Sequence, residues 1–264
     1  MKIAARAAGI RIGCAGWRIS KADAASFPID GSHLERYAAK FNAVEINSSF
    51  YRSHRPATYA RWAASVPPVF RFAVKMPRAI THRARLVDAA EPLDVFLSEV
   101  AGLGEKLGCL LIQLPPSLRF DRGSVGRFLT ALRRRHGGSA VIEPRHATWF
   151  GAPVGEFLAD HGVGRVAADP AVVASAASPG GDRRTLYFRL HGSPKMYCSA
   201  YEDAYLQALA QRIGAAEESG GQVWCIFDNT ALDAAVPNAL RTLHWVGELR
   251  RPAADFRPGK ALPQ

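Results

Sequence analysis

Residues 43–47 read Ala-Val-Glu-Ile-Asn, a short apolar run that ends in a carboxylate and an amide. Three later segments repeat this pattern: VIEPRH at 141–146, YFRLH at 187–191 and CIFDN at 225–229. Short runs that are apolar throughout are typical of strands buried on both faces of a sheet. Because each run turns polar at its end, we predict that these ends meet at one site.

Eight apolar runs of this kind alternate with segments of helical spacing. The predicted strands are 10–14, 43–47, 70–76, 109–114, 140–143, 164–168, 186–190 and 223–227. The predicted helices are 33–40, 55–65, 92–107, 124–135, 153–161, 202–218 and 234–249. Eight such strands that alternate with helices in about 250 residues are typical of the (β/α)8 barrel.

We therefore predict an α/β fold with a single TIM-barrel-like domain over residues 1–264. The barrel is expected at about residues 10–250, and the proline-rich segment 251–264 is expected to be a loosely held tail. A doubly wound open sheet is the alternative. Such a sheet would more often carry a glycine-rich phosphate loop after its first strand, and GCAGW at 13–17 is not such a loop.

The composition limits the class of protein. The chain has 264 residues and a net charge of +11, which favours an anionic partner, either a small molecule or nucleic acid. An arginine-rich composition would give the same charge without any ligand. No apolar run approaches the roughly 20 residues of a membrane helix, so no membrane partner is expected, and no oligomeric state is indicated. The four cysteines show neither CxxC nor metal spacing, which predicts a reduced cytoplasmic protein without a disulfide.

Polar side chains gather at the C-terminal ends of the predicted strands, which in a barrel converge on one rim. Burying many ionisable groups near an apolar core costs several kcal/mol for each uncompensated charge. Such a set either forms a salt-bridge network that closes the barrel or serves a ligand. The candidate site residues are Glu45, Asn47, Tyr51, Lys75, Gln113, Glu143, Arg145, His146, Asp169, Arg189, His191, Asp228 and Asn229.

The residue types suggest roles for these side chains. Glu45 and Glu143 are the acid–base candidates, and His146 and His191 can donate protons near neutral pH or act as ligands. The cations Lys75, Arg145 and Arg189 can hold a phosphate or carboxylate group. The remaining candidates are expected to bind substrate.

A divalent metal is one option for the site, because carboxylates and histidines together can hold one that activates water. No HExxH motif is present, and the nearby cations would compete with a metal. Aromatic residues that follow the strands can stack a base or sugar ring, or simply cover the barrel mouth. These residues are Trp17, Phe50, Tyr51, Trp149, Phe150 and Tyr197.

Three functions fit these residues. Hydrolysis of a phosphoester or phosphodiester ranks first, because the site combines acid–base groups with cations. Sugar isomerisation or glycoside cleavage by two facing carboxylates is the second. The third is a non-catalytic barrel that binds nucleic acid or a metabolite.

Several segments also resemble a known family. They are IGCAGW (12–17), FNAVEINSSFYR (41–52), FRFAVKMPRAITH (70–82), LLIQLPPSLRFD (110–121), VIEPRHATWF (141–150), YFRLHGSPKMY (187–197) and a stretch from Phe227 to Leu240 that begins FDNT. Together they resemble the family catalogued as domain of unknown function 72, the YecE-like proteins. Asp228 stands where many relatives have asparagine. The resemblance implies a TIM-barrel-like fold and no established activity.

Overall fold

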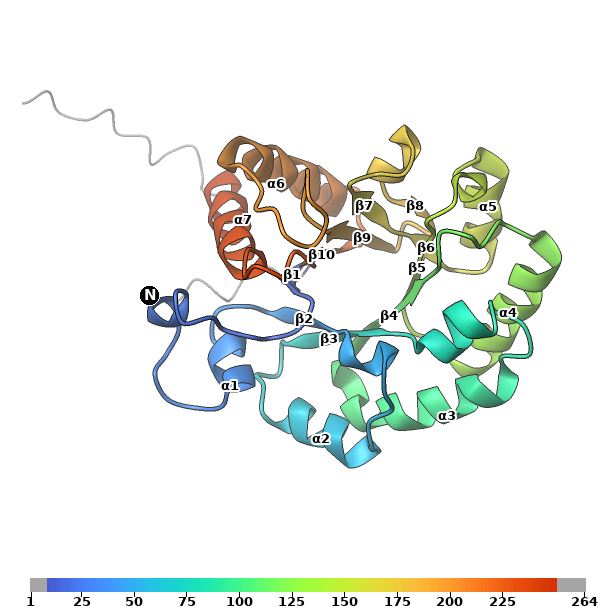
Figure 1. The fold of residues 1–264 in the computed structure, drawn as a ribbon, viewed down its shortest axis with the longest axis horizontal. Helices are drawn as coiled ribbons and strands as arrows, with labels where there is room; N and C mark the ends of the chain where they lie inside the picture. The colour runs from blue at the N-terminus through green and yellow to red at the C-terminus, as the bar shows by residue number, and fades with distance from the viewer. Residues whose placement is uncertain (1–8, 251–264) are drawn as a thin grey trace, which may run out of the picture.

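A ring of strands surrounded by helices forms the body of the protein (Figure 1). The computed structural model describes residues 9–250, so the predicted tail at 251–264 lies outside the described residues. The strands are β1 Ile10–Cys14, β2 Ala43–Ile46, β3 Arg71–Lys75, β4 Leu107–Gln113, β5 Ala140–Glu143, β6 Gly164–Arg165, β7 Ala167–Asp169, β8 Gly180–Gly181, β9 Thr185–Leu190 and β10 Gln222–Phe227. All eight predicted strands are confirmed, the sixth as the two short pieces β6 and β7.

The strand order closes the ring. One set of strands pairs in the order β1-β10-β9-β7 and the other in the order β2-β3-β4-β5-β6, and these pairs are parallel. Between β6 and β7 the amide of Val166 donates to the carbonyl of Ile142 at 2.9 Å, which joins the two sets on one side. A parallel bridge between Ala15 and Glu45 joins them on the other. The fold is therefore the predicted α/β, TIM-barrel-like fold, and the open-sheet alternative is wrong.

Side chains complete the join between β1 and β2. The Tyr37 hydroxyl accepts from the amide of Cys14 at 2.7 Å and donates to the carbonyl of Ala43 at 3.1 Å. The Asn42 side chain, just before β2, accepts from the amide of Ile12 at 3.0 Å and donates to the carbonyl of Ile10 at 2.8 Å. Gly13 is required here, because a Cβ atom at this position would lie 2.0 Å from the Ala43 carbonyl oxygen. The two strands thus approach closely without a regular hydrogen-bond ladder.

The helices lie outside the ring (Figure 1). They are α1 His33–Ala38, α2 Pro56–Ala64, α3 Ala90–Val100, α4 Arg122–Arg135, α5 Ala152–Asp160, α6 Asp203–Glu218 and α7 Ala235–Leu249. Short helical turns are η1 Ala24–Ser26, η2 Ser48–Phe50, η3 Ala79–Arg83, η4 Ala101–Lys106, η5 Ala147–Trp149 and η6 Ala174–Ala177.

Local sequence explains where these helices begin and where the pattern is interrupted. Ser32 and Glu35 form the reciprocal cap that starts α1. The segment between β7 and β9 carries η6 and the short antiparallel β8 in place of an α-helix. Within residues 9–250, no helix combines the length and apolarity needed to cross a bilayer.

The barrel interior explains why the polar strand ends meet. A separate apolar cluster, which includes Ala43, Leu111, Tyr187 and Trp224, fills it, and the Tyr187 and Trp224 rings stack with their centroids 5.9 Å apart. Side chains on one face of a strand recur every second residue. The residue two positions after an interior apolar residue therefore also points inward. This spacing gives the pairs Ala43 and Glu45, Ala73 and Lys75, Leu111 and Gln113, Val141 and Glu143, Tyr187 and Arg189, and Ile226 and Asp228.

Tyr37→Phe tests the join between β1 and β2. The substitution leaves the buried amide of Cys14 and carbonyl of Ala43 without their partner, so we expect a loss of about 1–3 kcal/mol in the free energy of unfolding. Urea unfolding measures it. Tyr51→Phe is the matched control, because Tyr51 is 72% exposed, and it should change stability by less than about 0.5 kcal/mol. Equal midpoints for the two variants would contradict the account.

Candidate functional site

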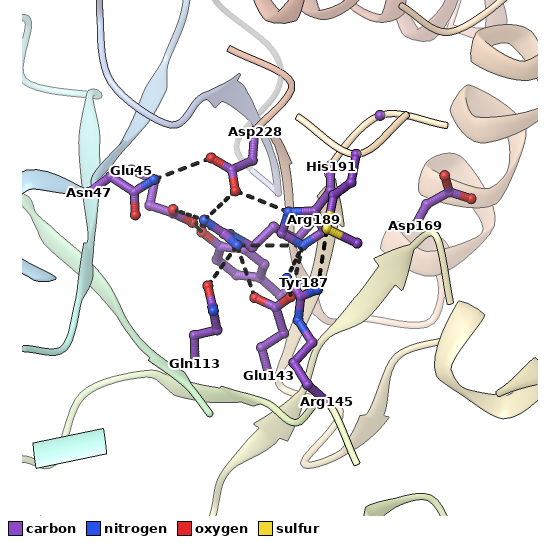
Figure 2. Close-up of polar contacts among 12 residues, drawn as sticks. Glu45, Asn47, Gln113, Glu143, Arg145, Asp169, Tyr187, Arg189, His191 and Asp228 are labelled. Atoms are coloured by element: carbon purple, nitrogen blue, oxygen red, sulfur yellow. Dashed lines mark hydrogen bonds and ion pairs between the residues drawn. The ribbon is translucent and has the colours of Figure 1, made fainter. Parts of the chain in front are cut away.

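A buried arginine forms the centre of the polar layer. Arg189 donates from Nε and one Nη to both carboxylate oxygens of Glu45, at 3.0 and 2.7 Å. Its guanidinium also contacts Glu143 at 3.1 Å and Asp228 at 3.0 Å. The side chains of Arg189, Glu45 and Glu143 are completely buried. One guanidinium therefore binds carboxylates from β2, from β5 and from the end of β10 (Figure 2).

The burial of these charges changes their proton affinity. Burial alone would raise the pKa of Glu143, but Arg145, Arg189 and His191 lower it by more, so it lies well below its usual range. The pKa of Asp228 is also lowered, because Arg189 and His191 outweigh the effect of burial. Burial lowers the pKa of Arg189, while Asp228, Glu45 and Glu143 raise it well above the ordinary value. Glu143, Asp228 and Arg189 are therefore charged at neutral pH.

His191 lies between two of the carboxylates. Its Nδ1 atom is 3.0 Å from Asp228, and its Nε2 atom is 2.8 Å from Glu143. An Nη atom of Arg145 is 2.8 Å from both the same Nε2 atom and Glu143. A ring that carries both protons donates to both carboxylates, whereas a ring protonated on Nδ1 alone accepts from Arg145. The contacts of His191 thus suit either protonation state.

Lys75 is buried beside this network but not part of it. It ends β3, is 6% exposed, and its ammonium lies 4.3 Å from the centre of the Phe50 ring. Among residues 9–250 its side chain makes no hydrogen bond or ion pair. Burial, followed by the charge of Arg189, lowers the pKa of Lys75 to about 8, although the three carboxylates oppose the shift. Arg189 occupies the carboxylates that would otherwise pair with this lysine.

Most of the predicted site residues come together in this layer. Gln113 accepts from Arg189 at 3.2 Å, and Asn47 donates to Asp228 at 3.2 Å. The Oδ1 atom of Asn47 and the Nε atom of Arg145 are buried without a partner. The predicted residues found together are Glu45, Asn47, Lys75, Gln113, Glu143, Arg145, Arg189, His191 and Asp228.

Two other predicted residues, His146 and Tyr51, make no contact with the Arg189 network among residues 9–250. His146 caps η5, where its Nδ1 atom accepts from the amide of Thr148 at 3.2 Å. Glu143 and Arg145 point into the barrel mouth, so the alternation of side chains directs His146 outward. Tyr51 is 72% exposed. Neither side chain contacts the Arg189 network in the described residues, so their predicted roles in catalysis and substrate binding stay predictions.

Two further predicted residues lie at the edge of the rim. Asp169 accepts from the Tyr201 hydroxyl at 2.8 Å, and Figure 2 shows it apart from the Arg189 network. Asn229 donates to the Ser199 carbonyl at 2.9 Å and to Asn238 at 2.9 Å, which fixes the loop after β9. The expectation that Asp169 and Asn229 bind substrate beside Arg189 is not supported by these contacts.

Sequence reasoning missed two contributors. The Tyr187 hydroxyl donates to Glu45 at 2.8 Å, and the detectable signal was its position two residues before Arg189 on the same strand face. The Met196 sulfur lies 4.0 Å from Arg145. Met196 belongs to the loop after β9, and no local sequence pattern predicts that contact.

The aromatic residues separate into different roles. Tyr197 packs edge-on against His191, with ring centroids 5.6 Å apart, and so covers the cluster. Trp17 packs against Trp62 beside a pocket of about 390 Å³ that Asn47 also lines. Trp149 is fully buried and donates to the Leu118 carbonyl, so it is core packing and not part of a wall over the rim.

The residues present do not fit a resident divalent metal. Among residues 9–250, no three histidine, cysteine, aspartate or glutamate side chains are arranged to hold one. The carboxylates Glu45, Glu143 and Asp228 are already in contact with the Arg189 guanidinium. Cations this close repel a second positive charge.

Comparison with known proteins gives relatives of unknown function. The model of the family described as "Protein of unknown function DUF72" matches residues 11–261. The UPF0759 protein YecE of Escherichia coli K12 is 30% identical over 118 residues, which is 44% of this chain and 43% of YecE. The UPF0759 protein YunF of Bacillus subtilis is 24% identical over 150 residues, 54% of this chain and 53% of YunF. The matches thus span about half the length of these relatives.

Solved structures share the fold over nearly the whole chain. A DUF72 family protein from Enterococcus faecalis V583 superposes with a TM-score of 0.78 at 19% identity, covering 96% of this chain and 99% of that one. A DUF72 family protein from Thermotoga maritima MSB8 gives a TM-score of 0.75 at 24% identity, covering 92% and 99%. At these identities the likeness concerns the fold alone.

Arg189→Met tests the central contact. The variant leaves the buried Glu45 without its only ion pair among residues 9–250 and removes one of the two arginines that contact Glu143, so we expect it to lose about 3–5 kcal/mol of unfolding free energy. Urea unfolding is the measurement. Arg241→Met is the control, because Arg241 pairs with Asp203 at the partly exposed surface, and it should cost less than about 1 kcal/mol. Similar losses in both variants would show that Arg189 does not hold the layer together.

Lys75→Met tests whether burial of the Lys75 ammonium lowers the free energy of unfolding. The pKa of Lys75 is lowered from 10.5 to about 8 in the folded chain, so the unfolded chain binds more protons between these pH values. Stability should therefore rise with pH across this window. We expect Lys75→Met to unfold at higher urea than the native chain at pH 7, by roughly 1–3 kcal/mol, and the difference to shrink by pH 10. A stability difference between the variant and the native chain that does not change with pH would contradict the lowered pKa of Lys75.

Proposed function

The chain belongs to the DUF72 family of proteins of unknown function, and on that premise we propose that its C-terminal rim binds a small phosphate-bearing substrate and hydrolyses the phosphoester. The observation that carries the proposal is Lys75, a residue only 6% exposed whose ammonium lies beside the charged cluster and makes no hydrogen bond or ion pair with residues 9–250. A buried cation without a partner is costly. A phosphate group between Lys75 and Arg145 would supply that partner.

The charge of the cluster supports an anionic ligand. Its three carboxylates, Glu45, Glu143 and Asp228, are matched in number by the cations Lys75, Arg145 and Arg189. An incoming phosphate group, which carries one or two negative charges, would be contacted by the cations Lys75 and Arg145.

The proposed proton donor is His191, with Asp228 holding its Nδ1 atom. Protonation of the leaving oxygen by a histidine is a common contribution to ester cleavage. The ring is fully buried, and Tyr197 covers it. The proposal therefore requires the loop at 192–200 to move when substrate enters.

Glu45 and Glu143, which the sequence suggested as acid–base groups, are assigned positioning roles instead. Both oxygens of Glu45 are bound by Arg189, and one also accepts from Tyr187. The lowered pKa of Glu143 keeps it ionised, so it cannot serve as the general acid that glycoside cleavage needs. The geometry thus favours phosphoester hydrolysis over the sugar-directed alternative.

A non-catalytic anion-binding barrel is the second candidate. One observation favours it: each carboxylate of the cluster already contacts a guanidinium, so the network is satisfied without a substrate. A small buried site and an extended nucleic-acid surface also differ in their response to salt. Binding through many phosphate contacts weakens steeply as salt is added, whereas one buried phosphate site should respond weakly.

Measurements of phosphate binding and of ester turnover distinguish the hydrolase from the non-catalytic anion-binding barrel. We expect inorganic phosphate to bind the native chain in calorimetry, and Lys75→Met to weaken it at least about tenfold through loss of a charge-assisted contact. Affinity should fall as pH rises through about 8, because Lys75 then loses its proton. Lys40→Met is the control, because Lys40 lies exposed on the surface. Equal affinity in native chain and Lys75→Met would reject the site.

A phosphomonoester and a phosphodiester of p-nitrophenol test catalysis. We expect His191→Asn to lower kcat by about 10²-fold or more with a small effect on KM, because an asparagine amide cannot donate a proton to the leaving oxygen. Phosphate binding with no turnover of either ester would favour the non-catalytic barrel. Turnover unchanged by His191→Asn would reject the acid role.

A further inference from the structure

We propose a second chemistry at the barrel mouth: the Lys75 amine forms an imine with the aldehyde or ketone carbonyl of a small anionic ligand. The inference goes beyond phosphoester hydrolysis and does not depend on it. It follows from the position and contacts of one side chain, which differ from those of every other lysine among residues 9–250.

The other described lysines are exposed or hydrogen-bonded. Lys21, Lys40 and Lys195 are exposed to solvent. Lys106 donates to the carbonyls of Ala63 and Val66. Lys75 alone among the lysines of residues 9–250 is buried and has no hydrogen-bond acceptor. An amine in this state keeps its lone pair available once it loses its proton.

The surroundings hold this amine in one place. The Ser49 hydroxyl lies 2.6 Å from the Lys75 carbonyl oxygen and 2.9 Å from the Ile46 carbonyl oxygen, which fastens η2 to the ends of β2 and β3. Phe50, the last residue of η2, then places its ring face 4.3 Å from the ammonium. The backbone of Lys75 is therefore fixed to η2, and η2 places an aromatic face against the amine.

The charged groups around the amine suit imine formation. Those that face it are Glu45, Glu143, Asp228, Arg189 and, from η3, His82. Burial and the Arg189 charge favour the neutral amine, with a pKa of about 8, so a nucleophilic fraction exists near neutral pH. The carboxylates and the Phe50 face would stabilise the cationic iminium product.

The reaction balances without another reagent. The amine lone pair attacks the carbonyl carbon, the carbonyl oxygen takes up a proton, and the nitrogen loses one to give a carbinolamine. The carbon–oxygen bond then breaks, and the oxygen leaves as water with a second proton, which leaves the carbon–nitrogen double bond. His191 is the proton donor within the same layer, because its Nε2 atom faces the cluster. An anionic group on the ligand would pair with Arg145.

Reductive trapping tests the proposal on the full chain. Glycolaldehyde phosphate is incubated with the protein and sodium borohydride, and the adduct is located by peptide mass spectrometry. We expect one adduct, on Lys75, that forms at least about tenfold faster than any adduct on Lys21, Lys40 or Lys195 and accelerates as pH rises through about 8. Lys75→Arg, with its fold checked by circular dichroism, should remove this adduct and leave the slow ones.

Two results would overturn the proposal. One is an adduct spread evenly over the exposed lysines, and the other is an unlabelled Lys75 in a folded chain. Uncharged glycolaldehyde should react more slowly at Lys75 than its phosphate, and equal rates would reject the anionic ligand class. Failure of the imine is distinguishable from failure of phosphate binding, because trapping strengthens with pH while phosphate binding weakens.

Discussion

The Arg189 guanidinium is the interaction on which the polar layer depends. It lies at the centre of a closed barrel and binds carboxylates from three strands that are far apart in the sequence. Each of these carboxylates would be costly to bury alone. Because this one cation contacts all three, and Arg145 also contacts Glu143, a group of charges can lie directly above an apolar interior.

This arrangement divides the site into groups that are fixed and groups that are free. Glu45 is held on both oxygens by Arg189 and on one of them also by Tyr187, so it can orient its neighbours but has little capacity left for a substrate. His191 and Lys75 differ from it. The ring of His191 suits two protonation states, and Lys75 has no hydrogen-bond acceptor among the described residues. The proposed chemistry of the rim is therefore assigned to these two side chains.

A fold that is shared with other proteins gives little guidance on activity, because activity depends on a few side chains at the rim. The two solved DUF72 structures establish the barrel over nearly the whole chain, but a barrel supports many reactions through a few residues at its rim. The proposed anionic ligand would be selected instead by the balance of charges within one layer. The buried Lys75 and the unpartnered Nε atom of Arg145 are the particular observations on which the proposed anionic ligand rests.

The sequence by itself determined the barrel, the positions of its strands and most of the rim residues. Apolar runs fix strands locally, and the polar residue after each run, such as Glu45 or Asp228, indicates the rim. Only the tertiary structure separated His191 from His146 and joined Tyr187 to Glu45. The reason is geometric. Local sequence indicates that a residue lies at a strand end, whereas barrel closure and the inward or outward direction of each side chain decide which charges meet.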